Sequence, residues 1–254
     1  MTSSNIKSIT DKIILDHQYL SIKDAEALFN AISVADVDCI QEAANTLRER
    51  LNGNTVSYVV NLNVNFTNIC ECRCLFCGFR RNATDPDAYT ITIDELSQKL
   101  SGAVKKGAIE VCYQGGLNPK LDIKGLKSKN IIDTYAQLLL WTKEHYPTLM
   151  THAYSPEEIF FLQTLTGKSV RYILEYLKDH GLETMPGTAA EILVDSVRKK
   201  ICTKKLKTAD WINVIKTAHK LRLPTTAAIL YGTGETSKDR AKHLDILKNI
   251  QKET

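Results

Sequence analysis

The sequence predicts an α/β protein whose parallel sheet is open or curls into a partial barrel. Three observations support this fold class. From about residue 58, strand-like and helix-like segments alternate, an order that gives right-handed crossovers and parallel strands. Two helical patterns precede this alternation. Only five strand-like segments follow, too few to close a barrel, and the last of them is followed by a helix.

Each element is predicted from the spacing of its apolar residues. Residues 21–51 fit two helices. Strands are predicted at residues 58–66, 109–114, 148–154, 182–186 and 225–231. Helices are predicted at residues 94–106, 131–145, 156–164, 169–180 and 208–221, and a last one begins near Lys238. We therefore expect an N-terminal helical segment over residues 1–57 and a core domain over residues 58–254.

The composition is that of an ordinary folded protein. Hydrophobic residues make up 43% of the 254 residues and charged residues 24%, both close to globular averages. The net charge of +4 is too small to indicate a nucleic acid or an anionic membrane as partner. The densest basic run, residues 198–207, is interpreted as a solvated helix end and loop. Because neither a signal peptide nor an apolar stretch of about 18 residues is found, we expect a cytoplasmic location.

Four of the seven cysteines lie in Cys70-Glu-Cys-Arg-Cys-Leu-Phe-Cys77, directly after the first predicted strand. The spacing Cys70-x3-Cys74-x2-Cys77 is typical of three thiolates that bind three irons of a cubane and leave the fourth without a protein ligand. Structural zinc and redox chemistry are alternatives, but zinc prefers two such pairs, and only Cys74 and Cys77 form one. Cys72 is interpreted as a bystander. The remaining cysteines are predicted to be structural: Cys39, Cys112 and Cys202.

Further motifs follow predicted strands, where parallel α/β folds carry their active sites. Gln114-Gly-Gly116 has paired glycines, which would let backbone N–H groups approach a ligand. Glu191 either binds sugar hydroxyls or is a carboxylate favoured at a helix start. Tyr231-Gly-Thr-Gly-Glu235 is a glycine-rich turn with a carboxylate. Two more side chains are candidates for substrate contact: His152 and Tyr154.

The cysteine loop, with Phe76 before its last cysteine, resembles that of radical S-adenosylmethionine (radical SAM) enzymes. Within that superfamily, residues 61–254 resemble the second-subunit family of deazaflavin (FO) synthase. The phrases that carry this resemblance are Asn65-Phe-Thr-Asn68, Asp85-Pro-Asp-Ala-Tyr89, Gln114-Gly-Gly-Leu117, Met185-Pro-Gly-Thr-Ala-Ala-Glu-Ile192 and Trp211 to Thr226. The resemblance implies a partial (β/α)6-type TIM-like barrel that lacks its last strand or strands.

The resemblance also implies a cofactor site. Cys70, Cys74 and Cys77 would hold a four-iron four-sulfur (4Fe-4S) cluster, whose open iron takes the amino and carboxylate groups of S-adenosyl-L-methionine. Further cofactor-binding residues implied in the same way are Phe76, Gln114, Gly115, Gly116, Glu191, Gly232 and Glu235. Thr233 stands where relatives often have His, and the catalytic residues remain unknown.

The activity implied is reduction of S-adenosylmethionine to a 5′-deoxyadenosyl radical, which takes a hydrogen from L-tyrosine. The 4-hydroxybenzyl fragment then adds to 5-amino-6-(D-ribitylamino)uracil. The implied partners are the first subunit of FO synthase, of the CofG type, and a reductant protein. Family members continue through a sixth strand, so we expect this chain to be truncated at its C-terminus. Two alternatives stay open: a futalosine-pathway menaquinone enzyme of the same superfamily, and a non-catalytic scaffold that holds zinc or a cluster.

Overall fold

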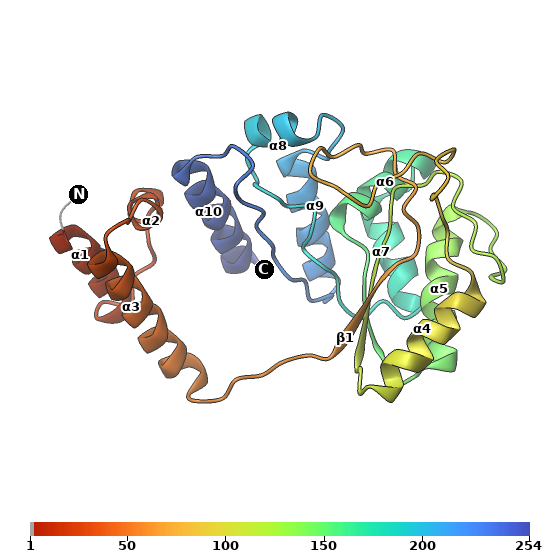
Figure 1. Ribbon diagram of the computed structural model, residues 1–254, viewed down its shortest axis with the longest axis horizontal. Coiled ribbons are helices and arrows are strands. Elements are labelled where there is room, and N and C mark those ends of the chain that lie inside the picture. Colours follow the sequence, from red (N-terminus) through yellow and green to blue (C-terminus); the bar gives the residue numbers. More distant parts are fainter. Residues whose placement is uncertain (1–2) are drawn as a thin grey trace. The chain divides into compact units, whose positions relative to one another are not determined.

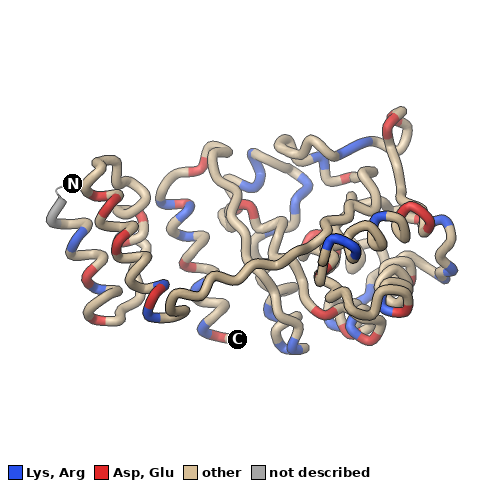
Figure 2. The backbone as a smooth tube through the Cα atoms, turned by 60° about the horizontal axis from the view of Figure 1, so that its bottom comes forward, with Lys and Arg blue, Asp and Glu red and all other residues tan. Residues whose placement is uncertain are grey.

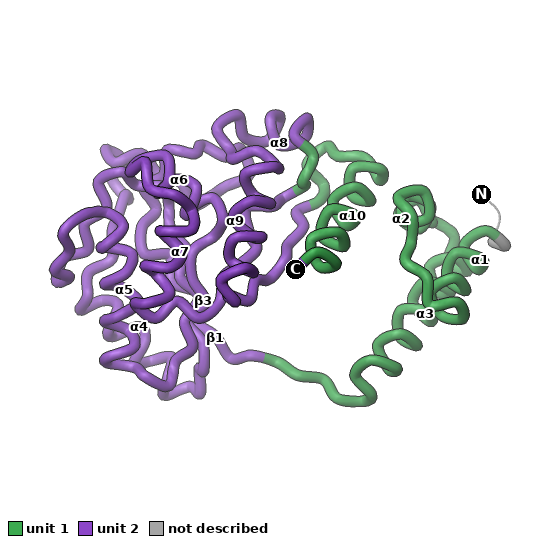
Figure 3. The backbone as a smooth tube through the Cα atoms, turned by 180° about the vertical axis from the view of Figure 1, so that it is seen from behind, with its two compact units in different colours: residues 1–58, 192–194, 231–253 green, residues 59–191, 195–230, 254 purple. Residues whose placement is uncertain are grey.

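The computed structural model describes residues 3–254 and consists of two compact units, drawn in green and purple in Figure 3. The first unit comprises the described residues up to Tyr58, with Ile192–Val194 and Tyr231–Glu253. The second unit comprises Val59–Glu191, Asp195–Leu230 and Thr254. The last helix therefore belongs with the N-terminal helices. The division at residues 57 and 58 expected from the sequence stays a prediction.

The second unit is built on a parallel sheet with the strand order β1-β2-β3 (Figure 1). Its strands are β1 (Asn61–Asn65), β2 (Glu110–Gln114) and β3 (Met150–Ala153). Its helices are α4 (Ile93–Lys105), α5 (Ile131–His145), α6 (Pro156–Thr166), α7 (Val170–Asp179), α8 (Asp195–Ile201) and α9 (Thr208–Lys220). The predicted alternation of strands and helices is confirmed as far as α7, and the short helix α8 was not predicted.

The fourth and fifth predicted strands, at residues 182–186 and 225–231, are wrong as full strands. They contribute only two isolated parallel bridges, His152 with Thr184 and Met185 with Thr225. Pro186 has no N–H with which to continue a ladder. At Gly187 the backbone passes so close to Thr226 that an added Cβ would lie 1.8 Å from its carbonyl oxygen. The parallel order thus continues past β3, but without extended strands.

The core of the second unit is formed by the sheet and the apolar faces of its helices. Helix α6 packs against α7 and α9, and α5 packs against α7. Three buried rings meet directly beneath the ends of the strands, with centroids 4.7–6.1 Å apart: Phe66, Tyr135 and Tyr154. Burial of each such side chain contributes on the order of 2 kcal/mol. This core supports the loops that follow β1 and β2.

The first unit is helical and contains α1 (Ser3–Ile14), α2 (Ile22–Phe29), α3 (Val34–Asn52) and α10 (Ser237–Glu253). Helix α1 packs against α3, and α2 packs against α10. A capping box between Ser21 and Asp24 begins α2. The sequence did not predict α1, which buries Ile6 and Ile9.

Charged residues are interspersed by sign along the chain (Figure 2). This distribution agrees with the small net charge of +4. Of the helices that the structure describes, none has both the length and the apolar content needed to cross a membrane.

Candidate functional site

The loop that carries the clustered cysteines follows β1 and is fixed by backbone hydrogen bonds. Glu71 N donates to Leu117 O at 3.1 Å, and Leu75 N donates to Ile201 O at 2.9 Å. The loop therefore lies between the turn that follows β2 and the end of α8.

Two of the three predicted cluster ligands share a pocket with the predicted glycine motif. Cys70 and Cys77 line a cavity of about 200 Å³, together with Gln114, Gly115 and Gly116. Cys77 is exposed, whereas Cys70 is partly buried. The pocket thus joins the ends of β1 and β2 at the carboxyl edge of the sheet, where such folds carry their chemistry.

The third predicted ligand, Cys74, lies next to two other sulfur-bearing side chains and a buried ammonium group. Its Sγ is 3.6 Å from Cys72 Sγ and 3.8 Å from Lys205 Nζ. The pKa of Cys74 is lowered, because its hydrogen bond with Cys72 and the positive charge of Lys205 both favour the thiolate. A thiolate is the form that binds metals. Cys74 is therefore prepared to act as a ligand.

Lys205 links the cysteine loop to two carboxylates. Its Nζ lies 2.8 Å from Glu191 and 3.7 Å from Glu157, and its side chain is 7% exposed. Burial alone would lower the pKa of Lys205, but the two carboxylates outweigh burial and raise it. The same ammonium lies 5.6 Å from the centre of the Phe76 ring. Phe76 and Glu191, both predicted to bind cofactor, thus share one cationic neighbour that the sequence analysis missed.

The interpretation of residues 198–207 as a solvated basic run is wrong for two members. The Lys205 side chain is 7% exposed, and Arg198 is 2% exposed. The Arg198 guanidinium donates to the carbonyl oxygens of Leu206 at 2.8 Å and Ala189 at 3.1 Å, and also to Ala190 O. From the sequence alone, a run of basic residues resembles a solvated segment. The carbonyl oxygens and carboxylates that partner its buried side chains are recognised only in the folded structure.

The paired glycines are required by close packing. A Cβ at Gly115 would lie 2.4 Å from the Phe66 ring, and one at Gly116 would lie 2.2 Å from Ile69 O. Gly115 N donates to Glu158 at 3.0 Å, and Gly116 N donates to Thr67 O at 2.8 Å. The expectation that these N–H groups face a ligand is therefore wrong, because both are used within the protein. The assignment of the two residues to cofactor binding stays a prediction.

Gln114 connects β2 to the segment that contains Glu191. Its Oε1 accepts a hydrogen bond from Thr188 Oγ1 at 3.1 Å, and its Nε2 lies 3.3 Å from Cys112 Sγ. Thr188 O in turn accepts a hydrogen bond from Trp211 Nε1 at 3.1 Å. Glu191 adopts a φ of 46°, a conformation uncommon outside glycine. The fold thus holds Glu191 near the cysteine loop through Lys205.

The two candidates for substrate contact on β3 and just after it have structural partners. Tyr154 is fully buried and its hydroxyl donates to Tyr135 O at 2.7 Å, so the expectation that it contacts substrate is wrong. His152 Nδ1 lies 2.7 Å from Thr184 Oγ1. Burial lowers the pKa of His152. The side-chain contact with Thr184 gives His152 a structural role.

Gly232 and Glu235 lie in the first unit and form a closed turn there. Glu235 accepts hydrogen bonds at 2.8 Å from Gly232 N, Thr233 N and Arg240 Nε. Burial alone would raise the pKa of Glu235, but these donors lower it to about 2. Thr233 also donates its hydroxyl to Glu235 at 3.2 Å. The assignment of Gly232 and Glu235 to cofactor binding stays a prediction.

Comparison with known proteins identifies relatives along most of the chain. The family model of the radical SAM superfamily matches residues 64–247. A protein of Microcystis aeruginosa is 39% identical over 99% of this chain and 66% of its own length. One of Methanocaldococcus jannaschii is 43% identical over 91% of this chain and 60% of its own length. Both are named 5-amino-6-(D-ribitylamino)uracil--L-tyrosine 4-hydroxyphenyl transferase. This chain is thus shorter than these curated relatives and spans less than two thirds of their length.

Two solved structures share the fold. Methylornithine synthase (PylB) superposes with a TM-score of 0.73 at 17% identity, over 95% of this chain and 64% of the other. The hydrogenase maturase HydG superposes with a TM-score of 0.74 at 14% identity, over 99% of this chain and 52% of the other. The predicted α/β class, a partial TIM-like barrel, is confirmed. The chain belongs to the radical SAM superfamily, whose cofactors are a 4Fe-4S cluster and S-adenosylmethionine.

Proposed function

We propose that this protein transfers the 4-hydroxybenzyl group of L-tyrosine to 5-amino-6-(D-ribitylamino)uracil in the synthesis of the deazaflavin FO. The observation that carries this proposal is the 37–44% identity to relatives that are named for this pair of substrates. That identity extends over 84–99% of the chain. We assign the catalytic core to residues 58–254 and the N-terminal helical segment to residues 1–57.

The thiols of the loop after β1 fit the cluster. Cys70, Cys74 and Cys77 would bind three irons, since all three lie on one short loop and two of them line the pocket beside Gln114. The lowered pKa of Cys74, caused by the Cys72 thiol and Lys205, favours its thiolate. When bound, the cluster and S-adenosylmethionine supply a reactive carbon radical.

The chain's own residues bind S-adenosylmethionine and orient it. We assign binding of S-adenosylmethionine to Phe76, Gln114, Gly115, Gly116, Glu191, Gly232 and Glu235. Gln114 is oriented by Thr188 at 3.1 Å, and Glu191 is held by Lys205 at 2.8 Å. Fixed side chains of this kind keep reacting groups close together, which lowers the barrier to a step between them.

The proposal includes partners. A reductant protein would deliver the electron, and the first subunit of FO synthase, of the CofG type, would close the deazaflavin ring. We place the protein in the cytoplasm, where reducing conditions keep thiols free to bind a cluster.

The test is a set of parallel anaerobic incubations. Protein with a reconstituted, reduced cluster is supplied with S-adenosylmethionine, ring-labelled tyrosine and the ribitylaminouracil. Mass spectrometry should find the label in a 4-hydroxybenzyl adduct of the uracil, together with 5′-deoxyadenosine. Omitting tyrosine should leave only slow cleavage of S-adenosylmethionine. Label that stays in tyrosine, together with consumption of a futalosine-pathway substrate supplied in a parallel incubation, would replace this function with the menaquinone alternative. Bound zinc without sulfide would favour the scaffold.

A further inference from the structure

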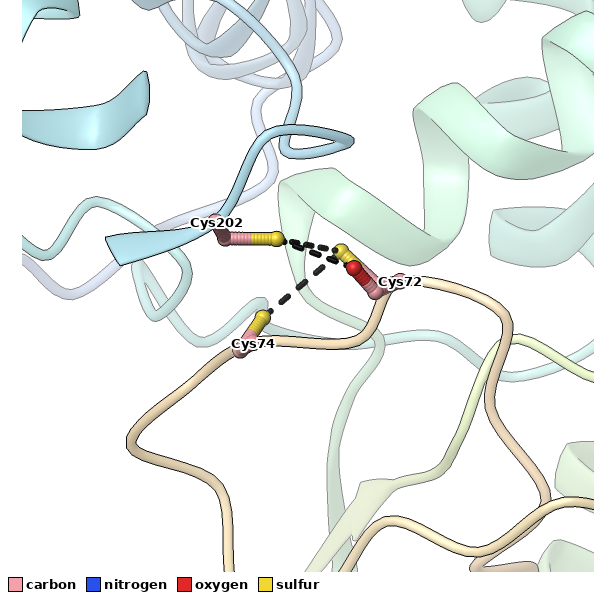
Figure 4. A group of neighbouring side chains, drawn as sticks. All are labelled: Cys72, Cys74 and Cys202. Atoms are coloured by element: carbon pink, nitrogen blue, oxygen red, sulfur yellow. Dashed lines mark hydrogen bonds between the residues drawn. The ribbon is translucent and has the colours of Figure 1, made fainter. Parts of the chain in front are cut away.

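Three cysteine thiols meet beneath the cysteine loop, although one of them comes from a distant segment (Figure 4). Cys72 Sγ lies 3.5 Å from Cys202 Sγ and 3.6 Å from Cys74 Sγ. All three sulfur atoms lie within 4.8 Å of one another. Over residues 3–254, this is the one group of three His, Cys, Asp or Glu side chains that comes so close.

The packing of the second unit holds this group together. Cys72 is 5% exposed and Cys202 is 3% exposed. Cys202 Sγ donates to Cys72 O at 3.0 Å. Leu117 and Phe161 pack against the same cluster. The three thiols are therefore positioned by the fold. The interpretation of Cys72 as a bystander of the cluster and of Cys202 as a structural cysteine stays a prediction.

The spacing of the sulfur atoms suits a single metal ion. Two thiolates bound at about 2.3 Å to a tetrahedral zinc ion lie about 3.8 Å apart, close to the 3.5 and 3.6 Å found here. Thiolates that hold a cubane bind different irons and stand farther apart. The Lys205 ammonium, which also pairs with Glu191 and Glu157, lies 3.8 Å from Cys74 Sγ and places a positive charge beside the three thiols.

We propose that Cys72, Cys74 and Cys202 form a zinc site, with a solvent molecule as fourth ligand. On binding, Cys72 and Cys202 release their thiol protons to water, as does any Cys74 that is still protonated, and all three bind the ion as thiolates. Because Cys74 also belongs to the proposed cluster ligands, zinc at this site and the cluster exclude one another. This second statement rests on the proposed function, whereas the zinc site itself does not.

The zinc site is tested on iron-free protein kept reduced, with Co²⁺ alone as a spectroscopic probe for zinc. We expect one equivalent of Co²⁺ to give a sulfur-to-cobalt charge-transfer band that Zn²⁺ abolishes. Cys72→Ser and Cys202→Ser should each lose most of the band, whereas Cys70→Ser and Cys77→Ser should keep it. Unchanged melting temperatures of the serine variants show that they fold. The proposal is overturned if Cys72→Ser keeps the band, or if Cys70→Ser and Cys77→Ser lose it.

Competition between the two sites is tested separately. One equivalent of Zn²⁺ added before iron and sulfide should prevent cluster assembly in the unaltered chain, but not in Cys202→Ser. Assembly that proceeds equally well in both would overturn the exclusion and leave the cobalt result standing. Failure to assemble a cluster without added zinc would count against the proposed function alone.

Discussion

The two sides of the cysteine loop differ in what surrounds their thiols. On one side, Cys70 and Cys77 line an open pocket beside the glycine motif. On the other, Cys72 is buried against Cys202. Cys74 lies at the boundary, within reach of the buried pair and of Lys205. The difference shows that one short loop presents two thiol sets, and that spacing along the sequence reveals only the set whose members are all local.

Removing a thiol from the pocket side should have the largest effect. We expect Cys70→Ser and Cys77→Ser each to abolish the absorbance of the reconstituted cluster and the cleavage of S-adenosylmethionine, because an iron loses its ligand. Cys72→Ser should retain both. Cys39→Ser, in the first unit, is the matched control. Loss of the cluster in Cys72→Ser with retention in Cys70→Ser would reverse the roles of the two sides.

Removing the ammonium group of Lys205 should strongly destabilise the buried side of the cysteine loop, where Cys72 meets Cys202. Lys205→Met leaves the carboxylates of Glu191 and Glu157 without their cationic partner. Breaking a buried ion pair in this way costs about 3–5 kcal/mol, so the free energy of unfolding in urea should fall by that amount. The exposed neighbour provides the control, since Lys204→Met should change the free energy by less than about 0.5 kcal/mol. Equal losses in the two variants would show that Lys205 is not needed for charge balance.

The pocket side should respond to pH through Glu158. Burial raises the pKa of Glu158 to about 7 from its ordinary value of 4.5. The folded state therefore binds a proton that the unfolded state has already released. The stability contributed by this proton is complete below about pH 4.5 and is lost as the pH rises to about 7, on the order of 3 kcal/mol in total.

The measurement for Glu158 compares urea unfolding between pH 5 and 8. Glu158→Gln should lose this downward slope of the unfolding free energy with pH, because the amide does not titrate. Glu49→Gln, at an exposed position, should keep the slope of the unaltered chain. A slope that persists in Glu158→Gln would assign the pH dependence to other groups.

Sequence patterns were sufficient for the elements whose signals are local. The strands β1 to β3 and the helices from α4 to α7 follow from apolar spacing, and Thr92 begins α4 with a capping box as its residue type favours. The segments at residues 182–186 and 225–231 have the apolar content of strands. They fail to pair fully because Pro186 and the close approach of Gly187 to Thr226 interrupt the ladder.

The candidate site was predicted from two kinds of signal, the spacing of the cysteines and the position of motifs after predicted strands, as for Gln114 and Glu191. The assignment of Cys70, Cys74 and Cys77 to the cluster depends on spacing and stays a prediction. Cys202 and Lys205 reach the loop through the tertiary fold, more than a hundred residues along the chain. Nothing in their own neighbourhood distinguishes a buried lysine from the solvated ones beside it, because burial is decided by what packs against the segment.

The smallest expected effect concerns the glycine motif on the pocket side. Gly116→Ala places a Cβ 2.2 Å from the backbone oxygen of Ile69, so the cysteine loop must shift away from the end of β2. Overpacking of this kind costs about 1–3 kcal/mol. Gly102→Ala is the control, because a Cβ there meets no atom within 4 Å and alanine should stabilise α4 by about 0.5–1 kcal/mol. Urea unfolding of both variants gives the two free energies. If Gly116→Ala is as stable as the unaltered chain, the cysteine loop can move without cost. Close packing of β2 against the loop would then not be the reason that position 116 is a glycine.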